Sequence, residues 1–258
     1  MEILVFIKQV PDDSVEIHLD PSTGLPALEG VTPVVNAFDT YALEMAARLK
    51  ESVGGEITVV SAGGEDVKNS LKNCLAVGAD QAYLVNCENA AALDAAGIAA
   101  VLSGAKAEIE ASTGKKFDLV FCGREATDYA SSQVGIALAK ELNAPVVTNV
   151  VAVETKDDTV TARQETESGY VLVEAPLPCV VTIQKPNYDP RYPTIKSKMA
   201  ARKKPIGDLA AKDAPESHLT VLKTYEPKKR AAGVKIKAES PEEAVAQAMQ
   251  LIEAARVL

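Results

Sequence analysis

The stretch GREATDYASSQVG, residues 123–135, carries the residue types that a phosphate site needs. It leaves a short apolar run through Gly123, continues through small and hydroxyl-bearing residues, and enters a predicted helix near Ser132. Main-chain N–H groups at a helix start, together with the hydroxyls of Ser131 and Ser132, are suited to hold a phosphate. Asp128 is able to accept hydrogen bonds from a ribose or an amide. The pattern predicts a nucleotide site, with an ordinary capped turn between strand and helix as the alternative.

A second segment, SAGGED at residues 61–66, allows close backbone approach at Gly63 and Gly64. It is weakly similar to the SGGxDS pyrophosphate loop of ATP-pyrophosphatases, although the order of its residues differs. An ATP-pyrophosphatase-type enzyme is therefore a distant alternative. Neither GxGxxG nor GxxxxGKS/T occurs in the sequence, so the dinucleotide fingerprint and the P-loop do not apply.

Catalytic and metal-binding patterns are missing from the sequence. The two histidines, His18 and His218, lie far apart, and no CxxC pair occurs among the four cysteines. We find no nucleophile–base arrangement, so we predict no catalytic residue and no metal site, and we expect each cysteine to be a small buried hydrophobic residue. A binding or carrier role is favoured over hydrolysis or group transfer, and enzymatic activity stays open.

The segments described so far have to be positioned by a sheet. Short apolar runs alternate with helical patterns, which is typical of βαβ units and a parallel sheet. The expected strands cover residues 3–7, 56–61, 82–86, 117–122 and 145–153, and the expected helices cover 40–50, 65–77, 90–111 and 132–142. The predicted fold is α/β, with a mostly parallel, Rossmann-like sheet and helices on both faces. Ligands bind such sheets at the carboxyl ends of the strands. Four segments are candidates for that edge: 8–13, 36–39, 61–66 and 123–135.

The second half of the chain follows another pattern. Residues 151–185 contain strand-like runs without helices between them, which predicts a hairpin extension that returns to the sheet. Residues 186–194 contain three prolines and are expected to be irregular. We expect residues 1–205 to form the nucleotide-binding core and residues 206–258 to form an extended arm and a terminal helix. That helix begins with Ser240 as N-cap and Pro241 in the first position, and it has to dock on its own domain or on another subunit.

Composition and charge limit the function. The chain has 258 residues, of which 47% are hydrophobic, and a net charge of −9, so it is expected to be globular and not a general nucleic-acid binder. Residues 196–204 nevertheless carry five basic side chains and no acid, which indicates either a solvated surface or a local site for an anion or a partner. The beginning of the sequence does not resemble a signal peptide and no stretch is long enough to span a membrane, so we expect a cytoplasmic protein.

Several longer motifs identify the chain as similar to a known family. They are VFIKQVPD near the start, NAFDTYALEMAARLK at 36–50, CLAVGAD at 74–80, CGREATDYASSQVG at 122–135 and LPCVVTIQKPNYDPRYPTIKSKMAARKKPI at 177–206. Over nearly its whole length the chain resembles the β (small) subunit of electron transfer flavoproteins. The resemblance implies an adenine nucleotide α hydrolase-like fold in a heterodimer, whose α subunit carries FAD at the interface. It also implies docking of the terminal helix on that subunit. Competing hypotheses are the ATP-pyrophosphatase type and a homodimeric, stress-protein-like nucleotide-binding module.

The resemblance also implies what the chain binds. Most members hold a structural AMP in this subunit, whereas electron-bifurcating members hold a second FAD there and take electrons from NADH. Residues 128–136 read DYASSQVGI here and DGDTAQVGP in the bifurcating members, so we expect AMP. The family's nucleotide contacts correspond to Phe6, Asn36, Ala37, Phe38, Asp39, Ala62, Gly123, Arg124, Glu125, Ala126, Thr127, Asp128, Tyr129, Ala130, Ser131, Ser132, Gln133 and Val134.

The family's electron-transfer partners are flavin dehydrogenases, commonly the acyl-CoA dehydrogenases of fatty acid β-oxidation, and a downstream acceptor oxidoreductase. A loop just before the PRY sequence recognises the dehydrogenase through a leucine anchor. The equivalent residue here is Asn187, so Tyr188 is the large group left to replace the anchor, and Arg191 belongs to the PRY sequence itself. By itself the chain is expected to be a carrier subunit that catalyses no reaction.

Overall fold

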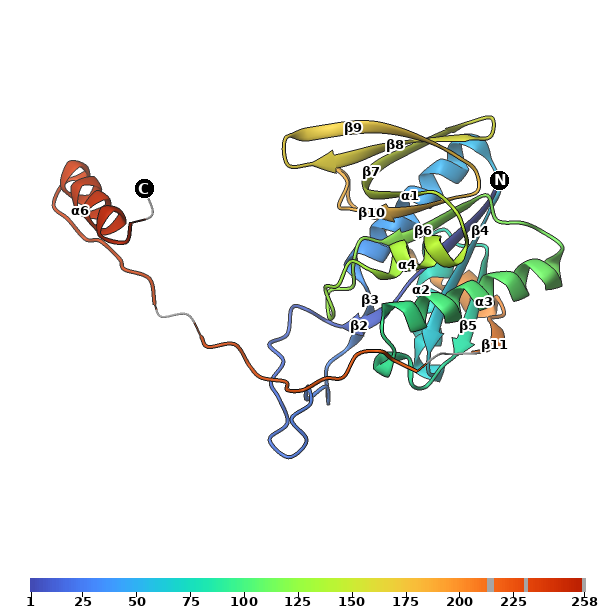
Figure 1. The fold of residues 1–258 in the computed structure, drawn as a ribbon, viewed down its shortest axis with the longest axis horizontal. Coiled ribbons are helices and arrows are strands. Elements are labelled where there is room, and N and C mark those ends of the chain that lie inside the picture. Colours follow the sequence, from blue (N-terminus) through green and yellow to red (C-terminus); the bar gives the residue numbers. More distant parts are fainter. Residues whose placement is uncertain (213–215, 230–231, 257–258) are drawn as a thin grey trace. The chain divides into compact units, whose positions relative to one another are not determined.

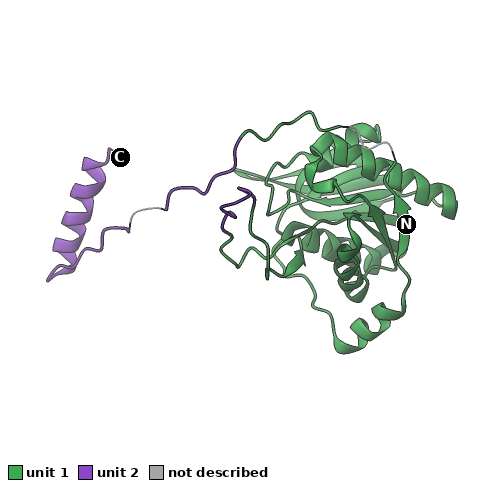
Figure 2. Cartoon of the chain, turned by 90° about the horizontal axis from the view of Figure 1, so that it is seen from below, with its two compact units in different colours: residues 1–17, 26–222 green, residues 18–25, 223–258 purple. Residues whose placement is uncertain are grey.

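The computed structural model of the chain describes residues 1–212, 216–229 and 232–256. Two compact units are present (Figure 2). Unit 1 comprises Met1–Ile17 and Pro26–Leu222, and unit 2 comprises His18–Leu25 and Lys223–Leu258. Each unit is described by itself.

Unit 1 is built on a nine-stranded sheet with the order β11-β5-β4-β1-β6-β10-β7-β8-β9 (Figure 1). Parallel pairing joins the first part of this order: β11 (Gly207–Ala210), β5 (Gln81–Asn86), β4 (Glu56–Gly63), β1 (Glu2–Phe6), β6 (Leu119–Gly123), β10 (Cys179–Ile183) and β7 (Val146–Lys156). Strands β8 (Thr159–Thr166) and β9 (Gly169–Pro176) extend the sheet in antiparallel pairing. A separate antiparallel pair is formed by β2 (Gln9–Pro11) and β3 (Pro33–Val35).

Helices cover both faces of the sheet, and the alternation of side chains along each strand decides which core a residue joins. Ile3 and Val5 of β1 pack with the helices α1 (Ala37–Val53) and α2 (Lys68–Val77). Leu4 and Phe6 point to the other face and pack with α3 (Ala95–Thr113) and α4 (Val134–Glu141). Short 3-10 turns, η1 (Glu65–Val67) and η2 (Ala90–Ala92), precede α2 and α3. This arrangement confirms the predicted α/β fold with a mostly parallel, Rossmann-like sheet.

The direction of chain crossing reverses beside β1. From β1 the chain runs through α1 to β4 and through α2 to β5, on one side of β1, and α3 then carries it back to β6 on the other side. The carboxyl ends of β1 and β6 are therefore a topological switch point, where open α/β sheets bind ligands.

The hairpin extension predicted for residues 151–185 is confirmed. Strands β7, β8 and β9 follow one another in antiparallel pairing, and β10 then returns to lie between β6 and β7. The cysteines are also as predicted, because all four are buried and unpaired.

Residues 207–210, which lie in the segment expected to be an extended arm, form the edge strand β11 beside β5. Gly207 passes against the ring of Tyr83 so closely that a Cβ atom would overlap it, while Leu209 is buried. An ion pair of 2.8 Å between Lys68 and Asp208 also holds this strand. Polar composition alone does not reveal such an edge strand, because an edge strand alternates buried and exposed residues over a short run.

Unit 2 contains the terminal helix α6 (Pro241–Ala254). The Ser240 hydroxyl accepts a hydrogen bond from the Glu243 N–H at 3.2 Å, and Pro241 occupies the first turn, as predicted. No described residue of α6 is buried, and Val245, Met249 and Leu251 expose large apolar side chains. Within residues 1–212, 216–229 and 232–256, no helix combines the length and the apolar character needed to cross a bilayer.

Candidate functional site

The predicted nucleotide contacts meet at the switch point. They come from the carboxyl ends of β1, β4 and β6, from the start of α1, and from the loop between β6 and α4 (Figure 1). Phe6, Ala62 and Val134 belong to one apolar cluster on the α3 and α4 face of the sheet. The structure gathers the predicted set at this edge: Phe6, Asn36, Ala37, Phe38, Asp39, Ala62, and the residues 123–134.

Asp39 in the first turn of α1 joins three elements through a buried carboxylate. Its Oδ2 accepts a hydrogen bond from the Lys8 N–H at 2.7 Å, and its Oδ1 accepts one from the Gly123 N–H at 3.0 Å. Burial raises the pKa of Asp39 to about 7, against the lowering effect of these hydrogen bonds. The side chain thus ties the ends of β1 and β6 to α1, and both of its oxygens are used for that purpose.

Gly123 is the residue at which β6 approaches α1 most closely. A Cβ atom at this position would overlap Oδ1 of Asp39 and would lie 2.8 Å from Cβ of Phe38. Every residue with a side chain would therefore force the strand and the helix apart. This contact explains why the stretch GREATDYASSQVG begins with glycine.

Asn36 holds the beginning of the loop from inside the protein. Its fully buried side chain donates from Nδ2 to the Glu125 carbonyl at 2.8 Å and accepts at Oδ1 from the Thr127 N–H at 3.1 Å. Its own N–H donates to the Lys8 carbonyl at 2.9 Å. The side-chain polar atoms of Asn36 and Asp39 bind the main chain and position the loop, while contact of these two residues with a ligand stays a prediction.

Arg124 is the residue after Gly123, and only some of its hydrogen-bond donors have partners among the described residues. Its guanidinium pairs with the Glu125 carboxylate and lies 5.2 Å from the centre of the Phe38 ring. Its Nε atom is buried without a hydrogen-bond partner among the described residues. The hydroxyl of Ser132 donates to the other oxygen of Glu125 at 2.6 Å, and this bond and the Arg124 charge lower the pKa of Glu125. The Nε–H of Arg124 is therefore a buried donor that the described residues leave without an acceptor.

The tip of the loop is a tight turn at which the Tyr129 N–H donates to the Ala126 carbonyl at 3.2 Å. Asp128 receives both of its hydrogen bonds, of 2.7 and 2.8 Å, from Nζ of Lys8. The pair crosses from the loop to the end of β1. In the sequence, Lys8 lies in a strand-end segment but not among the predicted contacts, and its place directly after the apolar run was the available signal.

The loop ends at the first turn of α4, where the main-chain N–H groups have no hydrogen-bond partner within the helix. Gln133 stands at the N-cap position and its side chain makes no capping hydrogen bond. The first N–H groups of a helix have no partner inside the helix, so those of α4 are available to an anion. Gly135 allows this turn to approach β10, because a Cβ atom there would lie 2.5 Å from Cγ2 of Thr182.

Ser61, at the end of β4, is a residue that the sequence did not single out as a contact. It is fully buried, and its hydroxyl has no hydrogen-bond partner among the described residues. Two open hollows of the surface lie elsewhere, around Gln164 and Gln184 and around Met199. At the switch-point edge, Nε of Arg124 and the hydroxyl of Ser61 are thus buried polar groups without a partner among the described residues.

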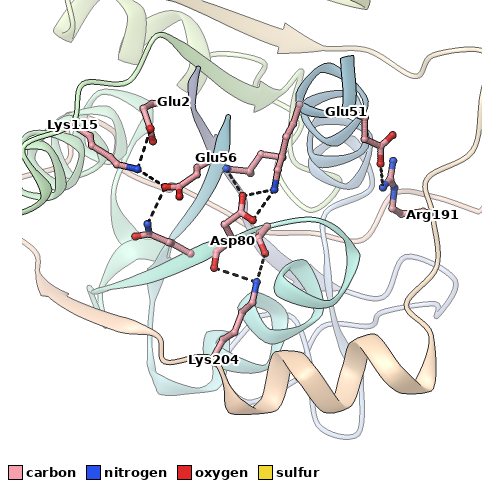
Figure 3. A network of polar contacts seen from close by, with 11 residues as sticks. Glu2, Glu51, Glu56, Asp80, Lys115, Arg191 and Lys204 are labelled. Carbon is pink, nitrogen blue, oxygen red and sulfur yellow. Dashed lines mark hydrogen bonds and ion pairs between the residues drawn. The ribbon is translucent and has the colours of Figure 1, made fainter. Parts of the chain in front are cut away.

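The residues predicted to bind a partner lie against α1. Asn187 is exposed, whereas the half-buried ring of Tyr188 is covered by the guanidinium of Arg48 at 3.8 Å. Arg191 is held by two carboxylates of α1, Glu44 at 2.7 Å and Glu51 at 2.6 Å, and Figure 3 shows the pair with Glu51. Tyr188 and Arg191 thus attach this segment to the surface of α1.

Comparison with known proteins shows the family to which the chain belongs. Residues 27–214 match the electron transfer flavoprotein domain. The chain is 35% identical to the electron transfer flavoprotein subunit beta of Megasphaera elsdenii over the full length of both chains.

Two further relatives are named after reductase complexes. The caffeyl-CoA reductase-Etf complex subunit CarD of Acetobacterium woodii is 38% identical over 80% of this chain and 77% of its own length. The acryloyl-CoA reductase electron transfer subunit gamma of Anaerotignum propionicum is 30% identical over 94% of both chains. From the matched domain and the relative that spans the whole chain, we conclude that the chain belongs to the electron transfer flavoprotein family, among its β subunits.

Proposed function

We propose that this chain is the non-catalytic small subunit of an electron-transferring heterodimer and that it binds AMP at the switch-point edge. The observation that carries the proposal is the open main chain at the start of α4, beside a loop that Asn36 and Asp39 hold in place. A phosphate accepts hydrogen bonds from such N–H groups without any catalytic side chain.

The edge offers partners for the rest of the nucleotide as well. Ala62 and Val134 are partly buried against the cluster that contains Phe6 and offer an apolar surface for an adenine ring, and Ser131 lies in the loop just before the N-cap residue Gln133. The buried Nε–H of Arg124 provides a hydrogen-bond donor that has no acceptor among the described residues. In this proposal, residues 124–134 bind the nucleotide mainly through the backbone, while Asn36 and Asp39 position that backbone.

A second candidate ligand is FAD, bound by its ADP part at the same edge. The names of two relatives favour it, because they belong to reductase complexes in which the subunit is one component. This form would make the chain part of an electron-bifurcating complex that takes electrons from NADH.

The proposed partners are an α subunit that carries FAD at the interface, a flavin dehydrogenase of the acyl-CoA type or a related type, and a downstream acceptor. The bound flavin of the α subunit supplies the redox chemistry. The apolar residues that α6 exposes support docking of this helix on the α subunit, since an isolated helix of 14 residues is marginally stable in water. Removal of residues 236–258 should then weaken the heterodimer in size-exclusion chromatography, and an unchanged elution profile at low concentration would contradict this docking.

The ligand is tested by denaturing the purified heterodimer and quantifying the released nucleotides. One FAD and one AMP per heterodimer supports the simple carrier, and two FAD without AMP supports the second candidate. One FAD and no other adenine nucleotide would refute a nucleotide site in this chain.

A matched pair of variants assigns the released nucleotide to this edge. Arg124→Gln should lower the amount of nucleotide that is retained, because it removes the buried donor. Arg163→Gln is the control, since Arg163 also lies on an aromatic ring, that of Tyr170, but belongs to β8. Equal retention in both variants would place the nucleotide elsewhere.

A further inference from the structure

We infer that residues 18–25 form a clasp that fastens the C-terminal arm, residues 223–240, at Glu226 and so positions α6 for the partner subunit. The two segments belong to the same compact unit (Figure 2). The clasp itself is a contact within this chain, whereas its effect on assembly rests on the proposed docking of α6.

One carboxylate of the arm binds two neighbouring residues near the start of the chain. Oε1 of Glu226 accepts a hydrogen bond from the Leu19 N–H at 2.9 Å. The same oxygen lies 3.4 Å from Nδ1 of His18, with which it forms an ion pair when the imidazole is protonated. The hydrogen bond from Leu19 lowers the pKa of Glu226, so the carboxylate is charged at neutral pH. A charged acceptor makes a main-chain hydrogen bond stronger than a neutral one does.

The loop that carries the clasp is long for its place in the fold. Residues 12–32 join the short strands β2 and β3, and none of them is buried. The Asp12 N–H donates to the Thr32 carbonyl at 3.1 Å and closes the base of the loop. Hairpin loops usually have about two to five residues, and much longer ones usually have a function. A contact with the arm gives this loop a role beyond joining two strands.

The clasp segment is ordered by its own hydrogen bonds. Oδ1 of Asp20 accepts from the Ser22 N–H at 2.7 Å. The Asp20 N–H donates to the Leu25 carbonyl at 2.8 Å, and the Gly24 N–H donates to the Asp20 carbonyl at 2.8 Å. Gly24 has a φ of +68°, which glycine adopts without strain. This turn directly follows Leu19, and a segment that is already ordered loses little conformational entropy when the arm binds.

The loop and the arm carry opposite charges. Residues 12–32 contain no lysine or arginine and five acidic residues, which are Asp12, Asp13, Glu16, Asp20 and Glu29. Residues 223–237 contain one acidic residue, Glu226, and six basic ones, which are Lys223, Lys228, Lys229, Arg230, Lys235 and Lys237. Opposite charges attract the arm to the loop. The one acidic residue of this stretch meets His18, the one side chain of the loop that can carry a positive charge, and this match sets the register.

The chain is also attached to the core just before the arm. Oδ2 of Asp94, the N-cap residue of α3, accepts a hydrogen bond from the His218 N–H at 2.8 Å. Lys212 forms an ion pair of 2.8 Å with Glu108 on the same helix. The clasp therefore shortens the tether of α6, from one that begins at residue 219 to one that begins at residue 227. A shorter tether raises the effective concentration of a docking segment at its site.

The clasp is tested by hydrogen exchange of the full-length chain, followed by mass spectrometry of peptides that cover residues 18–25 and 223–229. Glu226→Ala should raise the exchange rate in both peptides about threefold, because the Leu19 N–H loses its acceptor. High salt should have the same effect in the wild type, because it screens exposed charges. Glu239→Ala is the matched control, since it removes another exposed carboxylate from the same arm and should keep wild-type rates.

An exchange of charges distinguishes a direct contact from a general loosening of the arm. His18→Glu should raise the exchange rate in residues 223–229, because two carboxylates then face each other. Addition of Glu226→Lys to His18→Glu should bring this rate back towards the wild-type value. Wild-type rates in Glu226→Ala, or a double variant that exchanges as fast as His18→Glu alone, would overturn the clasp.

The role of the clasp in assembly is measured on the heterodimer. Glu226→Ala should raise the Kd between the subunits about threefold, because α6 then has a longer tether. Deletion of residues 236–258 should abolish the difference between Glu226→Ala and the wild type, because no helix is left to be positioned. An unchanged Kd in Glu226→Ala, in a protein whose heterodimer the deletion weakens, would overturn this role. If the deletion leaves the heterodimer unchanged, the proposed docking of α6 fails, and the exchange rates still decide whether the clasp exists.

Discussion

The loop at 123–135 and the segment at 184–203 leave the carboxyl ends of two neighbouring parallel strands, β6 and β10, and are used in opposite ways. In the first, buried side chains of α1 hold the main chain and leave N–H groups open at the start of α4. In the second, carboxylates of α1 hold Arg191 and leave exposed the side chains of Tyr192 and α5 (Ile195–Lys203). The same helix thus supports a loop that leaves main-chain N–H groups open and a surface that leaves side chains exposed.

The difference teaches how the two regions tolerate change. A backbone site depends on close approach, so a single added methyl group damages it. A surface of exposed side chains depends on its charge and on the contacts that hold its backbone to α1. Its side chains can therefore be altered one at a time without unfolding the protein.

The largest effect is expected at the backbone site. Gly123→Ala forces a Cβ atom into the carboxylate of Asp39, so we expect a loss of about 3 kcal/mol in the free energy of unfolding and loss of the bound nucleotide. Urea unfolding and nucleotide release measure both quantities.

Gly104→Ala is the matched control for that substitution. Gly104 lies in α3 with no atom within 4 Å of the position of its Cβ, so the change should stabilise the protein by about 0.5–1 kcal/mol. A Gly123→Ala protein with wild-type stability would show that the approach of β6 to α1 is not a constraint.

The next effect is expected where carboxylates of α1 hold the segment of residues 184–203 through Arg191. Glu44→Gln removes a buried charge that two arginines share, and we expect a loss of about 2 kcal/mol in the free energy of unfolding. Hydrogen exchange in residues 186–194 should become faster, because Arg191 loses its main acceptor, while nucleotide content should stay at the wild-type level.

Glu51→Gln is the matched control for Glu44→Gln, since Glu51 pairs with the same guanidinium of Arg191 from an exposed position. Its cost should stay below about 1 kcal/mol. Similar exchange rates in both variants and in the wild type would mean that Glu44 does not fix the segment.

A pH dependence of stability is also expected at the loop of residues 123–135. The pKa of Asp39 is raised to about 7 in the folded protein, whereas an aspartate in an unfolded chain titrates near pH 4. Between these values the folded state binds a proton that the unfolded state has released, so the stability contributed by this group falls as the pH rises from about 4 to 7. In Asp39→Asn, unfolding midpoints across this range should fall less steeply than in the wild type, and parallel profiles would exclude the effect.

The sequence by itself determined the fold class, most of the order of strands and helices, the edge at which the candidate residues gather and the family resemblance. These features are encoded locally. The spacing of apolar residues and the glycines or prolines at the ends define each helix or strand, and parallel strands bring their carboxyl ends to one edge of the sheet. The loop motif at 123–135 was recognisable because its glycines and hydroxyl residues follow a buried strand directly.

Only the tertiary structure decided what individual side chains do. Asn36 and Asp39 turned out to hold the loop, Lys8 to pair with Asp128 across a sequence distance of 120 residues, and residues 207–210 to join the sheet as an edge strand. Tyr188 lies under Arg48, while Tyr192 is exposed. The physical reason is that hydrogen bonds and burial depend on partners that lie far away in the chain, and one sequence does not specify which of its polar groups will meet.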